Sequence, residues 1–350
     1  MARPAIPEAS RRRLDDTVVR LRALLPDDWN LTVAHRQPDR GIISIADDDG
    51  TEATVSVVTR HRLEPRDIGR LTQPAGSVIV AASWLSPRSR ELLRDSQIGF
   101  LDHTGNVELR LRKPALYIRA EGSRTDPDPK PSTGPTLRGP RVWALVRTLI
   151  EVTPPYTAGD PSSALGIDDG YVSRVLQTLA DERLISRRPR GAVTTVEWEP
   201  LLRRLAETYS FFAANETTTW VASAGPEQLL DDIAAAKAGR WAVTGSFVAS
   251  SLAPVAAPAI ACVYADDPER FAKVGRLLPS SIGANVILAK PYDPIVFQRG
   301  WRDAGFPSVS VAQSAIDSLT GTARMPAGGE ALINWMRRDP SRWREVTLGR

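Results

Sequence analysis

The segment that most constrains the fold of this chain runs from Gly166 to Gly191 and reads GIDDGYVSRVLQTLADERLISRRPRG. Apolar residues recur in it at three- and four-residue steps, so one face of a helix should pack inward while polar and basic side chains line the opposite face. The inward residues are Val172, Val175, Leu176 and Leu179. Gly166 is suited to end a preceding helix, and Asp168 or Asp169 is suited to cap the new one.

An arginine-rich hairpin is expected directly after this helix. The helix should end near Arg183, and residues 184–188 should form the first strand, with Pro189, Arg190 and Gly191 at the tip. Basic side chains crowd the helix end and the hairpin, namely Arg183, Arg187, Arg188 and Arg190. A surface that contacts a phosphate backbone needs such a cluster.

Two further helices are expected upstream. Residues 141–151, RVWALVRTLIE, have helical apolar spacing. Their inward positions are Val142, Leu145, Val146, Leu149 and Ile150. A short second helix should occupy about residues 157–165. Because proline is tolerated only in a first helical turn, Pro161 places its start at about Asp160, with Asp160 as the cap. Three helices followed by a basic hairpin predict a winged helix-turn-helix.

The outward face of the third helix suits double-stranded DNA. Arg174 can contact guanine in bidentate fashion and Gln177 can contact adenine, while hydroxyl groups commonly reach phosphates. We therefore expect this helix to enter the major groove and the hairpin to touch the adjacent backbone. The predicted DNA-binding residues are Asp169, Tyr171, Ser173, Arg174, Gln177, Thr178, Arg187, Arg188 and Arg190. The alternative is a small helical module that binds protein or simply packs.

The composition and net charge of the chain exclude some classes of protein and leave others open. The net charge of +4 fits a polyanion without requiring one. The single cysteine, Cys262, excludes an intramolecular disulfide, and its apolar neighbours indicate a buried small side chain. The three histidines lack metal-ligand spacing, so no metal site is expected. No cofactor is expected either. No stretch has the length of a membrane span or the apolar core of a signal peptide, which predicts a cytoplasmic protein with no membrane partner.

The expected elements predict a multidomain α+β protein with three domains. Residues 123–138 are rich in proline and lack apolar periodicity, so they should form an extended linker. Residues 1–122 should form an α/β domain, residues 139–198 the winged helix-turn-helix, and residues 199–350 a C-terminal α/β domain.

The first domain has the element order of restriction-endonuclease-like folds. Helices are expected at residues 7–25, 65–71 and 87–95, the last capped by Ser86, and strands at 31–35, 42–46, 53–58, 78–82, 98–103, 107–112 and 116–119. The order helix, three strands, helix, strand is the skeleton of that fold. Such an analogy of order carries no function by itself.

Nuclease chemistry on this skeleton needs an aspartate on one strand and Glu-x-Lys on its neighbour, to hold a divalent metal. The only approximation is Asp102 with Glu108 and Arg110. Strand alternation directs Asp102 to the same core as Phe100 and turns Glu108 outward, and a two-residue turn should pair Asp102 with Leu109. The two carboxylates would then lie on opposite faces. We expect the domain to be an inactive relative of such nucleases.

In the C-terminal domain, a helix at residues 200–214 should present an apolar stripe that braces the domain or pairs with its copy in a homodimer. The stripe is Leu201, Leu202, Leu205, Tyr209 and Phe212. Helices are then expected at 227–238, 247–252, 311–319 and 329–338, and strands at 241–244, 259–264 and 285–288.

A nucleotidyltransferase would use a Gly-Ser turn such as Gly245-Ser246 with alternate acids on the next strand. Asp266 and Asp267 are adjacent, so they cannot share a strand face. They are expected instead to cap a helix over residues 269–274.

Three segments resemble the antitoxins of type IV abortive-infection (AbiEi-like) toxin–antitoxin systems and related bacterial transcriptional regulators. They are Val78–Leu109, the stretch around GYVSRVL, and Trp241–Pro254. The resemblance touches all three domains, and none of its motifs is catalytic. It implies a repressor or antitoxin that binds the promoter of its own operon, with a genetically linked toxin as a partner. The alternatives are an enzyme, either nuclease or nucleotidyltransferase, and a protein-binding regulatory module.

Overall fold

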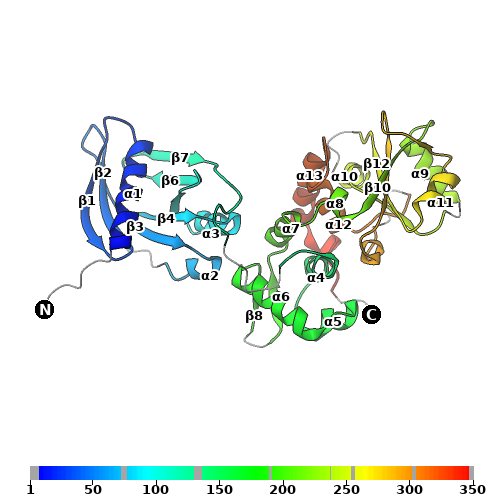
Figure 1. Cartoon of the computed structure of the whole chain (residues 1–350), viewed down its shortest axis with the longest axis horizontal. Helices are drawn as coiled ribbons and strands as arrows, with labels where there is room; N and C mark the ends of the chain where they lie inside the picture. The colour runs from blue at the N-terminus through cyan, green and yellow to red at the C-terminus, as the bar shows by residue number, and fades with distance from the viewer. Residues whose placement is uncertain are drawn as a thin grey trace. The chain divides into compact units, whose positions relative to one another are not determined.

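A seven-stranded sheet organises the N-terminal part of the chain in the computed structural model, which describes residues 8–71, 77–129, 136–188, 191–236, 238–253, 257–301 and 305–346 (Figure 1). The chain is an α+β protein and divides into two units. One comprises Met1–Pro131 with Asp181–Arg183, and the other Ser132–Ala180 with Leu184–Arg350. The division after Pro131 falls within the proline-rich segment expected to be a linker.

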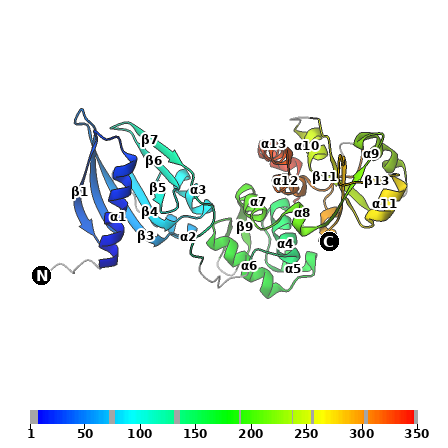
Figure 2. The same ribbon diagram turned by 45° about the horizontal axis from the view of Figure 1, so that its top comes forward.

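The strands of the first sheet follow one another in chain order from β1 to β7 (Figure 2). They are β1 (Asn30–Gln37), β2 (Arg40–Ala46), β3 (Glu52–Arg62), β4 (Ser77–Trp84), β5 (Gly99–Asp102), β6 (Val107–Leu111) and β7 (Leu116–Ala120). The pairs β3–β4 and β4–β5 are parallel and all others are antiparallel. Strands β1 and β7 therefore form the two edges.

Helices bury both faces of this sheet. Helix α1 (Glu8–Leu24) packs Leu14 and Leu21 on a cluster with Ile43 and Val57 of the sheet. The opposite face packs against α2 (Pro65–Ile68) and α3 (Pro87–Asp95), through Ile68 and Leu93 among others. Every helix and strand expected for residues 1–122 is present, and Ser86 caps α3 by accepting a hydrogen bond from the Ser89 amide.

The second unit begins with three helices and a two-stranded hairpin. These elements are α4 (Pro140–Glu151), α5 (Gly159–Leu165), α6 (Asp169–Asp181), β8 (Ile185–Arg187) and β9 (Val193–Val196). The helix expected at residues 200–214 was wrong as a single element. It is divided into α7 (Trp198–Ala206) and α8 (Phe211–Ala214). The break positions the Tyr209 hydroxyl within a buried polar cluster.

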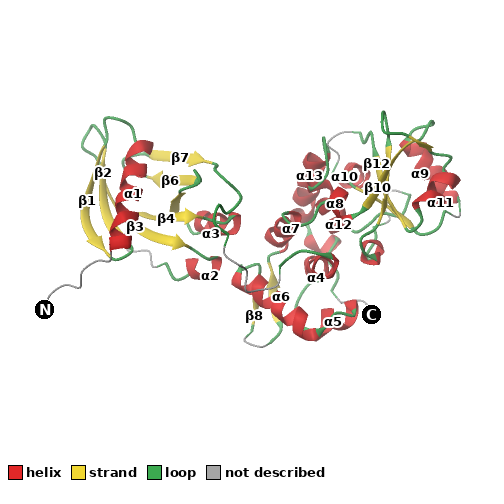
Figure 3. Ribbon diagram, in the orientation of Figure 1, coloured by secondary structure: helices red, strands yellow, loops and turns green. Residues whose placement is uncertain are grey.

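A five-stranded sheet with the order β11-β12-β14-β10-β13 forms the rest of this unit (Figure 3). Its strands are β10 (Glu216–Val221), β11 (Trp241–Thr244), β12 (Ala261–Ala265), β13 (Leu278–Pro279) and β14 (Val286–Lys290). The sequence did not predict β10 or β13. The remaining elements are α9 (Pro226–Ala235), α10 (Ser246–Leu252), α11 (Pro268–Val274), η1 (Pro294–Phe297), α12 (Val311–Leu319), α13 (Met325–Arg338) and η2 (Pro340–Arg342).

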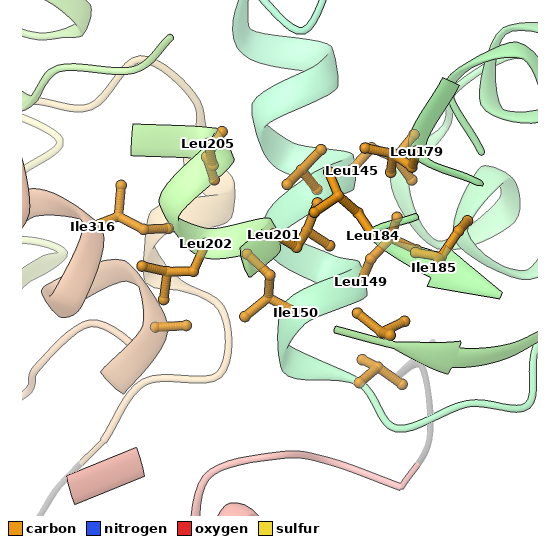
Figure 4. Packing of buried hydrophobic residues seen from close by; sticks show 14 of the residues in the cluster. Leu145, Leu149, Ile150, Leu179, Leu184, Ile185, Leu201, Leu202, Leu205 and Ile316 are labelled. Carbon is orange, nitrogen blue, oxygen red and sulfur yellow. The ribbon is translucent and has the colours of Figure 1, made fainter. Parts of the chain in front are cut away.

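One apolar cluster joins the three-helix segment to the C-terminal helices. Figure 4 shows Leu145 and Leu149 of α4 among side chains from the α6–β8 segment and from α7, and Ile316 of α12 lies beyond α7. Because other elements pack around α4, its residues from Ala144 to Glu151 are all buried rather than one face alone. Leu201, Leu202 and Leu205 of α7 are therefore buried within their own unit, as the bracing alternative requires.

Among the described residues, no helix combines the length and the apolar character needed to cross a membrane.

Candidate nucleic-acid interface

The turn between α5 and α6 is fixed by a glycine and an aspartate. Gly166 ends α5 in the left-handed region, with φ of 62°, as expected of a residue without a Cβ. Asp168 then accepts a hydrogen bond on Oδ1 from the Tyr171 amide at 2.8 Å, which identifies it as the cap of α6. Asp169 is the first residue of the helix and is exposed.

The start of α5 differs from expectation. The helix begins at Gly159, so Asp160 lies inside its first turn. The Asp160 carboxylate accepts from the backbone amide and the hydroxyl of Thr157, at 2.6 and 2.9 Å. Asp160 therefore holds the preceding loop rather than capping the helix from outside. Pro161 is in the same turn, where its missing N–H costs nothing.

Helix α6 has one buried face and one exposed face, as expected. Its inward residues Val172, Val175, Leu176 and Leu179 have no solvent exposure. On the other side Arg174 and Gln177 are exposed, while Tyr171, Ser173 and Thr178 are half-buried. Tyr171 also packs against the apolar cluster, and the Thr178 hydroxyl donates to the Arg174 carbonyl at 3.2 Å. Arg174 and Gln177 are thus exposed on the side of the helix that was predicted to face DNA.

The hairpin after α6 is anchored on its apolar side. Ile185, Val193 and Val196 are buried in the same cluster as α6. The ladder pairs Ile185 with Val196 and shifts register before Arg187. Arg188 extends the pairing through its amide, which donates to the Ala192 carbonyl at 3.1 Å, and its side chain is exposed.

Two other basic residues of the hairpin were also predicted to contact DNA. Arg187 is half-buried, and its Nε atom is buried without a hydrogen-bond partner in the structure. Arg190, which was also expected to contact DNA, lies outside the described residues together with Pro189. Among the described residues of the hairpin, Arg188 is therefore the exposed arginine that can contact phosphate.

The sequence did not predict that the loop before α5 pairs with the hairpin. Tyr156, between α4 and α5, bridges Val193 in antiparallel fashion, and the Val193 amide donates to the Tyr156 carbonyl at 2.8 Å. The bridge ties the loop before α5 to β9. A one-residue pairing leaves no alternating pattern in a sequence, which is why it was missed.

The carboxylates of the nuclease hypothesis lie on one face of the first sheet, contrary to expectation. Phe100 lies opposite Glu108 and Leu101 opposite Val107, so the predicted pairing of Asp102 with Leu109 is wrong. The turn is one residue longer than expected, because the Asp102 amide donates to the Asn106 carbonyl across three intervening residues. Residues directly opposite each other share a face, which places Glu108 on the side of Phe100.

Both carboxylates already have partners. The Asp102 oxygens accept from the backbone amides of Leu85, Thr104 and Asn106, and from the Thr104 hydroxyl and the Asn106 amide group. Glu108 pairs with Arg94 at 2.8 Å and with Arg110 at 3.5 Å. This pattern is that of a carboxylate closing a turn and of an ion-pair cluster, and a metal ion would have to displace several of these bonds.

The residue before the Gly245-Ser246 turn and the two acids after the next strand have structural partners. The Thr244 hydroxyl donates to the buried carboxylate of Asp317 at 2.7 Å. Asp267 caps α11 as expected, accepting from the Arg270 amide. The expected capping role of Asp266 was wrong, since its carboxylate pairs with Arg240 at 2.8 Å. Cys262 is buried as expected, and burial raises the pKa of its thiol to about 12.

Comparisons with protein-family models, with curated proteins and with solved structures found no match to this chain.

Proposed function

We propose that residues 139–198 form a winged helix-turn-helix that binds double-stranded DNA, and that the chain is a sequence-specific transcriptional regulator. The observation that carries this proposal is the two-sided character of α6. Its apolar stripe is fully buried, and its opposite side presents exposed Arg174 and Gln177 beside a hairpin with exposed Arg188. A helix is about 10–12 Å wide, which matches a major groove about 12 Å wide.

The roles of the individual side chains follow from their chemistry. Arg174 and Gln177 can read base edges, because a guanidinium matches guanine and a carboxamide matches adenine. Arg187 and Arg188 supply phosphate contacts, which fix the position of the protein without carrying sequence information. Tyr171, Ser173 and Thr178 can add hydroxyl contacts. Exposed Asp169 would repel phosphate, so its place near DNA is limited to a cytosine amino group.

The finer identity of the chain belongs to the same proposal. The resemblance to AbiEi-like antitoxins and related regulators supports action as a repressor or antitoxin on the chain's own operon, with a genetically linked toxin as its partner. In this reading the first unit is a restriction-endonuclease-like domain in which Asp102 stabilises a turn. A reporter fused to the chain's own upstream region tests this step, and equal expression with and without the protein would contradict it.

The duplex-binding proposal predicts different outcomes for two arginine substitutions. R174A should weaken binding to the preferred site by about 1–3 kcal/mol and relax preference at one base pair. R188A should weaken binding to all duplexes similarly and reduce the salt slope by about 1. Duplexes selected from a random library by the full chain provide the site, and fluorescence anisotropy provides the affinities.

R338A is the matched control for these variants, since it removes one exposed arginine from α13. It should leave the affinity for the selected site nearly unchanged. Equal loss for R174A on selected and random duplexes would remove its base-reading role. Failure to select any sequence would favour the protein-binding alternative. An inverted repeat with half-sites one helical turn apart would indicate a homodimer.

A further inference from the structure

The β7 edge of the first sheet carries an exposed aromatic ring next to several cationic side chains. Tyr117 on the edge strand β7 is 56% exposed, and it lies opposite Arg110 of β6 in the strand register. The Arg110 guanidinium lies over the Tyr117 ring, 5.1 Å from its centroid. Arg119 is two residues further along β7 and therefore on the same face. These three residues are called the β6–β7 platform.

The platform lies beyond the part of the sheet that α2 and α3 cover with apolar side chains. The apolar cluster under α2 and α3 takes its sheet residues from β3, β4 and β5, including Phe100, and, of the residues that the structure describes, none from β6 or β7. The other face of the same two strands packs toward α1 through Leu109 and Ile118. Tyr117 is thus held on a rigid sheet while its ring faces solvent.

The charge around the platform is mainly positive. Arg110 and Arg119 have side-chain exposures of 62% and 49%, and exposed Arg112 and Lys113 directly follow β6. Each platform arginine has one acidic partner: buried Glu108, which Arg94 also holds, lies 3.5 Å from Arg110, and Glu121 lies 3.5 Å from Arg119. Hydrogen bonding to Tyr117 raises the pKa of Arg119, and this guanidinium, charged at neutral pH like any arginine, lies beside the ring.

An aromatic ring among arginines fits unpaired bases with their phosphates. A base can stack on the open face of a tyrosine, and the surrounding guanidinium groups neutralise the backbone on either side. A duplex offers no such face, because its bases already stack on one another. An acidic peptide could satisfy the cations but would leave the ring without a flat partner.

We propose that the β6–β7 platform binds single-stranded nucleic acid, with one base stacked on Tyr117 and phosphates held by Arg110 and Arg119. This interaction is separate from the duplex binding proposed for α6. It would allow the chain to hold a locally opened strand or a transcript.

The test measures the affinity of the full-length chain for a labelled oligothymidylate of about twelve nucleotides, which suits the usual site sizes of such surfaces. Y117A should weaken binding about 5- to 100-fold, whereas Y117F should bind like the wild type because it keeps the stacking ring. R110A should also weaken binding and lower its salt dependence. R70A removes an arginine whose side chain is 83% exposed, and it should have little effect.

Several outcomes would overturn the proposal. One is an affinity of Y117A no weaker than that of R70A, and another is an absence of oligothymidylate binding by the wild type. Binding of an oligoglutamate peptide with the same Tyr117 dependence, in place of the oligonucleotide, would identify a protein partner. R174A separates the two proposals: it should spare single-strand binding, and loss of that binding in R174A would assign it to α6.

Discussion

Replacing Arg147 by alanine is expected to lower the free energy of unfolding of the second unit by about 3–5 kcal/mol. Arg147 is on α4 and has no solvent exposure. Its Nε donates to Glu151 at 2.8 Å, and its Nη atoms donate to the carbonyls of Ile295 and Gln298. Burial is the largest single influence and acts to lower the pKa of Arg147, but the opposing effects, led by the charge of Glu151, together outweigh it and the pKa is raised. The substitution removes one of the side-chain donors to the buried Glu151 carboxylate, which keeps Arg299 and Ser310, and it removes a donor from the carbonyls of Ile295 and Gln298.

The measurement is urea unfolding followed by tryptophan fluorescence, since Trp143 reports from the same helix. R337A is the matched control. Arg337 also pairs with a glutamate, Glu199, at 2.7 Å, but its side chain is 54% exposed, so its loss should cost at most about 1 kcal/mol. Equal losses for the two variants would show that burial of the Arg147 pair is not what stabilises α4.

The buried ion pair illustrates what the sequence could not predict about α4. Apolar spacing located the helix and its core residues Val142 and Leu145 correctly, because one stripe must pack somewhere. It could not show that a second set of helices covers the remaining faces, which makes Arg147 and Glu151 interior residues. Partners such as Ile295 are remote in sequence, and no local pattern records them.

In the first sheet, the sequence was likewise insufficient to assign side chains to the correct face. Alternation predicted the strands well, but it assumed one buried face. Because α1 covers one side and α3 the other, Leu109 and Phe100 are both buried on opposite faces, and Glu108 was assigned to the wrong one. The candidate interface was easier to predict. The α6 stripe is local and one-sided, so exposure of Arg174 follows directly from its spacing.

A buried carboxylate in the second unit connects several elements. Asp317 of α12 has no solvent exposure. Its Oδ1 accepts from the Tyr209 hydroxyl at 2.7 Å, the Tyr264 hydroxyl at 3.1 Å and the Gln313 amide at 2.9 Å, and its Oδ2 accepts from Thr244. Burial raises the pKa of Asp317 to about 6, although these hydrogen bonds oppose the shift.

The surroundings of Asp317 offer little other charge. Burial also raises the pKa values of Tyr209 and Tyr264 well above their ordinary range, so both hydroxyls stay neutral donors. The charge of Asp317 also interacts with Arg147 and raises the pKa of that arginine. The ionised form of Asp317 is therefore stabilised mainly by neutral hydrogen-bond donors. Titration of this one group should change the free energy of unfolding measurably.

Asp317 is expected to make the second unit more stable as pH falls from 7 to 4. The folded-state pKa lies above the unfolded value of about 4, so the folded chain binds the proton more tightly. The resulting stabilisation is fully present below about pH 4 and is lost as pH rises through about 6. D317N cannot titrate, and the neighbouring hydroxyls can reorient toward its amide. The difference in unfolding free energy between wild type and D317N should therefore change by roughly 2–3 kcal/mol between pH 7 and pH 4.

The control is D232N, which replaces an exposed aspartate on α9, and its difference from wild type should vary far less with pH. A wild-type-to-D317N difference that stays constant across this range would mean that Asp317 is ionised throughout, held by its four donors against the cost of burial.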